Sequence, residues 1–255
     1  MIMEETVIEL NGVEKTFRDF WLRPLAKAVC GLDLEVKRGD VFGLIGPNGS
    51  GKSTTIKMIL GLIRPTKGSV RLFGLDPREK AARARLGYLP ELSHLHPFLT
   101  AEETVMHYAG LSGMRRADAK RRAKGLLDEL NISHVAKRTV GGFSKGMARR
   151  VAIASALVAS PELLILDEPA SGLDPIGTRE VKELVSRLAD GGMTVLLTSH
   201  QLFDVQDICN RVAVMSEGRK VGGGMVADIV ENAVDKRHAL EEYFEARLNL
   251  RKGSE

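Results

Sequence analysis

The sequence predicts an α/β fold with a mostly parallel sheet, an antiparallel β subdomain and an inserted α-helical subdomain. Strand-like and helical segments alternate along most of the chain, which is typical of a parallel core sheet. Short continuous apolar runs at residues 41–45, 163–166 and 195–197 indicate strands covered by helices on both faces. A helical stretch from about residue 100 to 142 interrupts this alternation.

Length and composition are those of an ordinary globular domain. The chain has 255 residues, of which 44% are hydrophobic and 27% charged. The net charge of +4 is too balanced for a dedicated nucleic-acid binder. No stretch approaches the ~18–20 apolar residues of a membrane span, and the N-terminus MIMEETVIEL carries acid where a secretory signal carries base. We therefore expect an intracellular chain that serves a membrane only through a partner.

Antiparallel pairing is expected near both ends of the core. Residues 7–10 and 32–36 alternate apolar and polar side chains, as half-buried antiparallel strands do. Residues 212–215 and 219–221 flank a Ser-Glu-Gly turn, which predicts a closing hairpin.

The helical segments carry their own signals. Thr100 and Glu103 form a capping box, and apolar residues follow at helical spacing in the inserted subdomain. We expect a single domain over residues 1–255, divided as follows: core 1–90 and 143–224, helical subdomain 91–142 and C-terminal helical extension 225–255. The basic clusters Arg115-Arg116, Lys120-Arg121-Arg122 and Arg149-Arg150 are interpreted as solvated helix faces, with contact to phosphate or anionic lipid as the alternative.

Residues 46–54, GPNGSGKST, follow a buried strand and open a helix, and so match G-x-x-x-x-G-K-[ST] in the context that this motif requires. The glycines let backbone N–H groups curl around phosphate oxygens at the helix N-terminus. Lys52 supplies a positive charge for the β- and γ-phosphates, and the Ser53 hydroxyl is a ligand for Mg²⁺. The residues predicted to contact nucleotide here are Asn48, Gly49, Ser50, Gly51, Lys52, Ser53 and Thr54.

The strand at residues 163–166 ends in two carboxylates, Asp167 and Glu168. Asp167 is expected to hold Mg²⁺ and Glu168 to polarise the water that attacks the γ-phosphate. Together with the phosphate cradle, they predict a P-loop NTPase core that binds a nucleotide and Mg²⁺, which a small-molecule kinase, a GTPase or a helicase would also fit.

Three further segments distinguish among P-loop enzymes. Residues 143–147, FSKGM, lie between the cradle and the acidic strand and resemble the signature of ABC ATPases, usually LSGGQ. Residues 169–174 resemble the D-loop of that family, and His200 follows the next buried strand at the place of its switch histidine. The chain therefore resembles the nucleotide-binding subunit of an ABC transporter from about residue 7 to 224.

This resemblance implies a head-to-tail dimer in which Ser144 and Gly146 of one subunit close over ATP held by the other. It implies that His200 contacts the γ-phosphate, with Lys52 and Glu168 as the other catalytic residues, and that Asp174 communicates across the interface. The partners implied are a transmembrane permease and a second ATPase subunit, identical or different, and the location is the cytoplasmic face of the membrane. Phe17 best matches the aromatic residue that stacks on adenine, with Phe20 and Trp21 as alternatives because of an insertion near residues 18–27.

Two departures from the family pattern concern the site. Lys145 and Met147 replace a glycine and the glutamine of the signature, but Ser144 and Gly146 remain. Glu91 stands where the family usually has a glutamine that contacts Mg²⁺ or its water, and a carboxylate can still serve as an oxygen ligand. Such variants resemble the ABC-2-type exporter branch.

The function expected is ATP hydrolysis that drives transport, with export preferred over import. A soluble ABC ATPase acting on ribosomes or nucleic acid is the alternative, although such proteins usually carry two cassettes or a long coiled coil. An interaction protein with an inactive site is disfavoured because Lys52, Ser53, Asp167, Glu168 and His200 are all present.

Overall fold

The computed structural model describes residues 5–21 and 23–252, so residues 1–4, 22 and 253–255 lie outside the described part. The described chain forms two compact units. The first contains the residues up to Arg83 and those from Val185 onward, and the second is Ala84–Leu184. The second unit includes the helical segment expected at 91–142 together with the strands that flank it, and the domain boundaries expected at residues 90, 142 and 224 stay predictions.

An antiparallel sheet forms one part of the first unit. Its order is β2-β1-β4, where β1 is Thr6–Arg18, β2 is Pro24–Lys37 and β4 is Lys67–Leu72. Leu10 pairs with Leu34 on one side and with Val70 on the other, and all three side chains are buried. This confirms the antiparallel β part of the predicted fold. Within the insertion near residues 18–27, β1 ends at Arg18 and β2 begins at Pro24, and these two residues pair.

Parallel strands form the other part of the first unit. β3 (Val41–Ile45) pairs in parallel with both β7 (Thr194–Ser199) and β8 (Arg211–Ser216). Every residue of β3 and β7 is buried, as their continuous apolar sequences predict. β9 (Arg219–Met225) pairs antiparallel with β8, which confirms the predicted closing hairpin.

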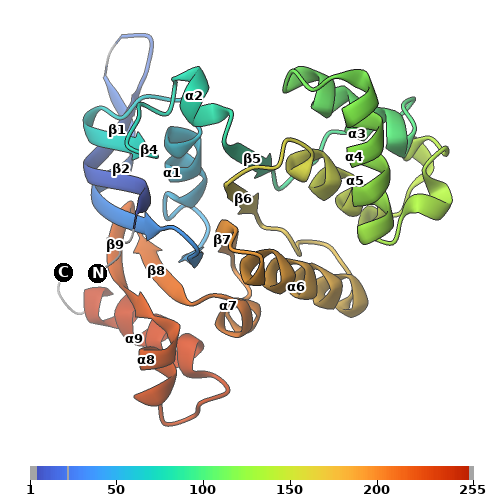
Figure 1. Ribbon diagram of the computed structural model, residues 1–255. Helices are drawn as coiled ribbons and strands as arrows, with labels where there is room; N and C mark the ends of the chain where they lie inside the picture. The colour runs from blue at the N-terminus through green and yellow to red at the C-terminus, as the bar shows by residue number, and fades with distance from the viewer. Residues whose placement is uncertain (1–4, 22, 253–255) are drawn as a thin grey trace. The chain divides into compact units, whose positions relative to one another are not determined.

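Helices cover the strands of the first unit. They are α1 (Lys52–Ile59), α2 (Lys80–Arg83), α7 (Leu202–Ile208), α8 (Val226–Glu231) and α9 (Ala239–Lys252). The C-terminal helix α9 packs on its own unit: the Tyr243 hydroxyl accepts a hydrogen bond from the backbone of Gly223 at 2.9 Å. The Gln206 side chain of α7 accepts another from the backbone of Leu240 at 2.9 Å, so α7, β9 and α9 are joined (Figure 1).

The second unit places helices beside a parallel pair of strands. Its elements are β5 (Leu86–Leu89), α3 (Ala101–Leu111), α4 (Arg116–Glu129), two short 3₁₀ turns (Ser133–Val135 and Val140–Gly142), α5 (Lys145–Leu157), β6 (Leu163–Asp167) and the start of α6 (Pro175–Asp190). β5 and β6 pair in parallel up to Leu89 and Leu166. α3, α4 and α5 pack together as a helical layer, drawn in green to yellow in Figure 1.

The capping box at the start of α3 is confirmed. The Thr100 hydroxyl accepts a hydrogen bond from the backbone of Glu103 at 3.2 Å, and the Glu103 carboxylate accepts one from the backbone of Thr100 at 2.9 Å. These bonds from Thr100 hold the pKa of Glu103 below its ordinary value. Two of the backbone N–H groups that a helix start leaves unpaired are thus satisfied.

Replacing Thr100 with alanine removes one of these bonds, and we expect Thr100→Ala to lower the free energy of unfolding by about 1 kcal/mol. Urea unfolding followed by far-UV circular dichroism measures the change. Glu102→Ala, in the same turn but outside the box, is the matched control. Equal shifts for the two variants would show that the capping box adds nothing specific.

Candidate functional site

The turn between β3 and α1 is packed so closely that glycine is required at its two ends. A Cβ atom added to Gly46 would lie 2.4 Å from the carbonyl oxygen of Met215 in β8. One added to Gly51 would lie 2.5 Å from the carbonyl oxygen of Ala28 in β2, and Gly51 also has a left-handed backbone with φ of 104°. Gly51 is the N-cap of α1 and offers no capping side chain, so the N–H groups at this helix start are left for another acceptor.

Lys52 and Ser50 occupy the interior of this turn. The Lys52 side chain is buried, and its ammonium donates to the carbonyl oxygens of Gly46 at 2.7 Å and Pro47 at 3.2 Å. The Ser50 hydroxyl is buried and makes no hydrogen bond within the described residues. A buried hydroxyl without a partner is costly, so this atom fits a site built for a ligand with polar oxygens. Asn48, Gly49 and Ser53 are exposed at the same turn, and Thr54 is half-buried.

His200 reaches the same edge of the sheet as the cradle. β3 and β7 run in parallel with Ile45 opposite Ser199, so the residues that follow, Gly46 and His200, leave adjacent strand ends. The Ser199 hydroxyl accepts a hydrogen bond from the backbone of Gln201 at 3.0 Å, which turns the chain just after His200. The first unit therefore brings the switch-histidine candidate and the cradle together.

The aromatic candidates for adenine lie on the β1–β2 hairpin. Phe17 is 39% exposed, with the Lys15 ammonium 5.4 Å from the centre of its ring. Phe17 pairs with Ala26, two residues before the Ala28 carbonyl that contacts the cradle turn. Phe20 and Trp21 lie farther out, 91% and 73% exposed, where the hairpin reverses. Phe17 is thus nearer to the cradle along the hairpin than either alternative.

The acidic pair lies at the end of β6 in the second unit. Asp167 is buried, and Glu168 is half-buried with an unusual left-handed backbone, φ of 48°. Leu89 and Leu166 pair at the ends of β5 and β6, so the loop that carries Glu91 leaves the sheet beside Asp167 and Glu168. Asp174 accepts a hydrogen bond from the backbone of Gly177 at 2.7 Å and so caps α6.

The signature residues form the start of α5. Ser144 is the N-cap, and its hydroxyl accepts a hydrogen bond from the backbone of Met147 at 3.3 Å. Lys145 is exposed. Among the described residues, a Cβ added to Gly146 would meet nothing within 4 Å, so packing within this part of the chain does not require glycine at this position.

The interpretation of Arg149 as part of a solvated helix face is wrong, because this residue is buried. Its side chain is only 7% exposed and donates to the backbone carbonyls of both loops that carry the acidic residues. Burial lowers its pKa to about 10, against the opposing effect of Asp167, Glu91 and Glu168, so the guanidinium stays charged at neutral pH. The sequence signal is the spacing to Ile153, which places Arg149 on the buried stripe of α5.

Other basic residues of these clusters form ion pairs nearer the surface than Arg149. Arg115 and Arg121 pair with Asp118 on the exposed side of α4, as predicted, and Arg150 pairs with Glu180. Burial next to Asp167 also raises the pKa of Tyr88.

A groove of about 450 Å³ lies in the second unit between the loop after β5 and the helical layer. Its wall is mostly apolar and includes Leu95, Tyr108, Leu111 and Ala152. Leu111 is 71% exposed, and Leu92 and Phe98 of the neighbouring loop are exposed as well. Apolar side chains gathered at a groove mark a surface suited to a partner.

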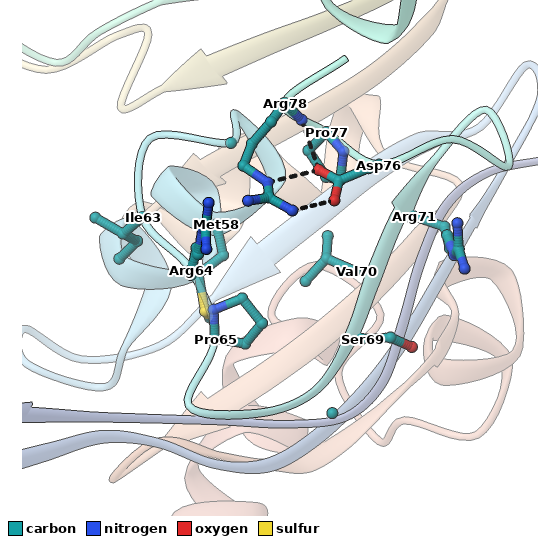
Figure 2. A pocket seen from close by; sticks show the side chains of 12 residues that line it. Met58, Ile63, Arg64, Pro65, Ser69, Val70, Arg71, Asp76, Pro77 and Arg78 are labelled. Atoms are coloured by element: carbon teal, nitrogen blue, oxygen red, sulfur yellow. Dashed lines mark hydrogen bonds and ion pairs between the residues drawn. The ribbon is translucent and has the colours of Figure 1, made fainter.

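A second pocket, of about 290 Å³, lies in the first unit beside α1 and β4. Figure 2 shows the guanidinium of Arg78 hydrogen-bonded to the Asp76 carboxylate at one side, with Met58 and Val70 also lining it. This ion pair holds the pKa of Asp76 far below its ordinary range. No sequence motif falls in this pocket, and the cradle lies at the other end of α1.

Two negative findings hold for residues 5–21 and 23–252. No three His, Cys, Asp or Glu side chains gather into a site for a metal ion. No helix in this part of the chain combines the length and the apolar character that crossing a bilayer takes.

Comparisons with known proteins agree with this geometry. An uncharacterised ABC transporter ATP-binding protein of Synechocystis is 35% identical over 233 residues, 90% of this chain and 66% of its own. The Nod factor export ATP-binding protein I of Paraburkholderia xenovorans is 36% identical over 234 residues, 91% of this chain and 75% of its own. The chain spans 66%, 68% and 65% of the first three curated relatives.

Solved structures show the same fold. The structure of an ATP-binding subunit of an ABC transporter matches 96% of this chain and 100% of its own, with a TM-score of 0.81 and 30% identity. A dimeric ATP-binding cassette in a post-hydrolysis state, bound to ADP and phosphate, matches 86% of this chain and 98% of its own, with a TM-score of 0.78 and 25% identity. The predicted fold class is therefore confirmed.

The sequence profile of the family described as ABC transporter matches residues 29–171, which include the cradle, the signature and the acidic strand. This match covers more than half of the chain, and the relatives named above cover nearly all of it. The chain belongs to the ABC transporter family, as one of its ATP-binding cassettes.

Proposed function

We propose that this protein is the ATP-hydrolysing subunit of an ABC exporter, bound to a transmembrane permease at the cytoplasmic face of the membrane. The observation that carries the proposal is the cradle, where the buried Lys52 ammonium, the unpaired Ser50 hydroxyl and an uncapped helix start converge on one turn. The export function named for the Paraburkholderia relative supports the direction of transport.

The cradle binds the phosphates of ATP. Lys52 places its charge against the β- and γ-phosphates, while the N–H groups at the start of α1 and the Ser50 hydroxyl donate to phosphate oxygens. Phe17, exposed on the hairpin next to the cradle, stacks on the adenine. Asn48, Gly49 and Thr54 complete the phosphate contacts.

The residues present fit a magnesium ion that arrives with ATP. Mg²⁺ in nucleotide sites takes only one or two protein carboxylates together with phosphates and water, so the lack of a three-residue cluster among the described residues agrees with it. Ser53, Asp167 and Glu91 are the oxygen ligands proposed to hold it, directly or through water. The ion supplies neutralisation of the charge that develops on the phosphates.

Hydrolysis relies on positioning more than on covalent chemistry. Glu168 orients and polarises the attacking water, and His200 contacts the γ-phosphate from the end of β7. The buried strands β6 and β7 that precede these two residues suit this task, because catalytic groups must lie within a small distance of the productive geometry.

A second cassette completes the site. Ser144 and Gly146 contact the γ-phosphate bound by the partner cassette, and Asp174 lies at the interface between the two. The open space at Gly146 supports this role, since no neighbour among the described residues requires glycine there. ATP thus favours a closed dimer, and hydrolysis releases it.

The apolar groove between Leu95 and Leu111 is the proposed docking site for a helix of the membrane subunit. Helices dock into such grooves through their apolar face. The loop after Glu91 forms one wall of this groove, so movement of the permease reaches the catalytic loop.

Loss of the cradle charge should weaken nucleotide binding. We expect Lys52→Ala to raise the Kd for ATP by roughly 10- to 100-fold, because a hydrogen bond to a charged group contributes about 1.5–3 kcal/mol. Calorimetric titration measures this, with Lys57→Ala on the same helix as the matched control. Unchanged affinity in Lys52→Ala would refute the cradle role.

Loss of the water-orienting carboxylate should spare binding but slow turnover. We expect Glu168→Gln to bind ATP normally and to hydrolyse it at least ~100-fold more slowly. Phosphate release under saturating ATP measures kcat, with Glu162→Gln, one residue before β6, as the control. Near-normal turnover in Glu168→Gln would remove this residue from its proposed role.

The transporter assignment is tested by what co-purifies from gently solubilised native membranes. We expect an integral membrane subunit to copurify with the wild type but not with Leu111→Asp, because a charge in the groove opposes apolar docking. Leu62→Asp, equally exposed in the first unit, is the control. Ribosomal or DNA-binding proteins in place of a membrane subunit would leave the ATPase assignment standing and overturn the transporter role.

A further inference from the structure

We propose that Arg149 is a positioning residue that joins the Glu91 loop to the end of β6, and so sets where Glu91, Asp167 and Glu168 meet Mg²⁺ and ATP. The inference rests on the ATP hydrolysis proposed above. It extends that proposal to a residue whose side chain acts through the backbone of the two loops that carry Glu91, Asp167 and Glu168.

Both edges of the Arg149 guanidinium donate hydrogen bonds. On one edge, Nη1 donates to the carbonyl oxygens of Pro90 at 2.8 Å and Glu91 at 3.0 Å, and to the Ser93 hydroxyl at 3.3 Å. On the other, Nε donates to the carbonyl of Pro169 at 2.9 Å. Nη2 donates to the carbonyls of Asp167 at 3.1 Å and Glu168 at 2.8 Å.

This pattern requires arginine. The guanidinium is a rigid planar fork with five N–H groups, which lets a single side chain bond to two separate segments at fixed angles. Five of the six acceptors are backbone carbonyls, so the side chain fixes the path of the two loops and does not simply neutralise a carboxylate.

The two loops need such a connection because the sheet no longer provides one. The β5–β6 pairing ends at Leu89 and Leu166, one residue before Pro90 and Asp167. Beyond that point, the distance between the Glu91 loop and the acidic pair depends on contacts outside the ladder. Arg149 supplies them from α5, which packs on β5.

Glu168 in particular depends on this support. A left-handed backbone is strained for a residue other than glycine, and Glu168 has φ of 48°. Its carbonyl accepts hydrogen bonds from Arg149 Nη2 and from the backbone of Ser171 at 3.1 Å. Strain of this kind persists only where the surroundings hold the residue in place, and these two bonds do so.

The same connection reaches the docking groove. Pro90 and Ser93, which accept from Arg149 on one edge, also line the groove proposed for the membrane subunit. A helix bound in this groove contacts the loop that carries Pro90 and Ser93. The planar guanidinium of Arg149 joins this loop to the backbone of Glu168. Arg149 therefore hydrogen-bonds both to the wall of the groove and to the backbone of Glu168.

The test compares Arg149→Gln and Arg149→Lys with the wild type in the full-length protein. Arg121→Gln, an exposed arginine paired with Asp118 on α4, is the matched control. Affinity is measured by calorimetric titration of ATP, and kcat and KM by phosphate release over a range of Mg²⁺ concentrations. Far-UV circular dichroism and melting temperature report folding.

We expect Arg149→Gln to bind ATP within about 3-fold of the wild type because the cradle residues are unchanged, while kcat falls about 100-fold, as small misplacements of catalytic groups do. Arg149→Lys keeps the charge but not the fork, and its kcat should lie between the two. Arg121→Gln should match the wild type in every measurement.

A folded Arg149→Gln with wild-type kcat overturns the inference, and so does a variant that loses stability and affinity without any selective loss of kcat. If Arg149→Gln does not fold, Arg149→Lys decides, since wild-type kcat in that variant shows that the fork is not needed. A wild type that binds but does not hydrolyse ATP refutes the proposed function itself, and this inference with it.

Discussion

The nucleotide site depends on the close approach of two backbone carbonyls to the turn after β3. Met215 O and Ala28 O leave no room for a side chain at Gly46 and Gly51, respectively. Because these oxygens belong to β8 and β2, the turn is clamped between the parallel strands and the antiparallel hairpin. Lys52 can then bury its ammonium over the carbonyls of Gly46 and Pro47. The shape of the cradle is therefore a property of the whole first unit and not of the nine-residue motif alone.

The parallel pairing of strands also determines where the other site residues lie. The carboxyl ends of parallel strands lie at one edge of a sheet, and loops at that edge collect functional residues. β3 and β7 place the cradle beside His200, and β5 and β6 place Glu91 beside Asp167 and Glu168. One fold rule thus accounts for two groups of site residues. Arg149 adds what strand pairing cannot, a fixed spacing between loops after the ladder has ended.

The sequence alone predicted those helices and strands whose signals lie within a few neighbouring residues. Continuous apolar runs predicted β3, β6 and β7, and Thr100 with Glu103 predicted the start of α3. Two features depended on distant partners and were missed. Residues near 18–27 lack apolar alternation, yet they extend the hairpin because β1 and β2 pair along their length. Arg149 has the spacing to Ile153 that marks the buried stripe of α5, but the acceptors that surround its guanidinium belong to loops distant in the sequence.

The turn of the β1–β2 hairpin has a practical consequence. Trp21 is the one tryptophan of the sequence, and its indole is 73% exposed. The Asp19 carboxylate accepts hydrogen bonds from the backbones of Trp21 and Arg23, which ties the residue that carries the ring to a position next to the end of β1. Its ultraviolet emission therefore comes from a single, defined place on the surface. The native protein carries an optical reporter on this hairpin, and anything that covers the turn can be followed in solution without a dye or an added label.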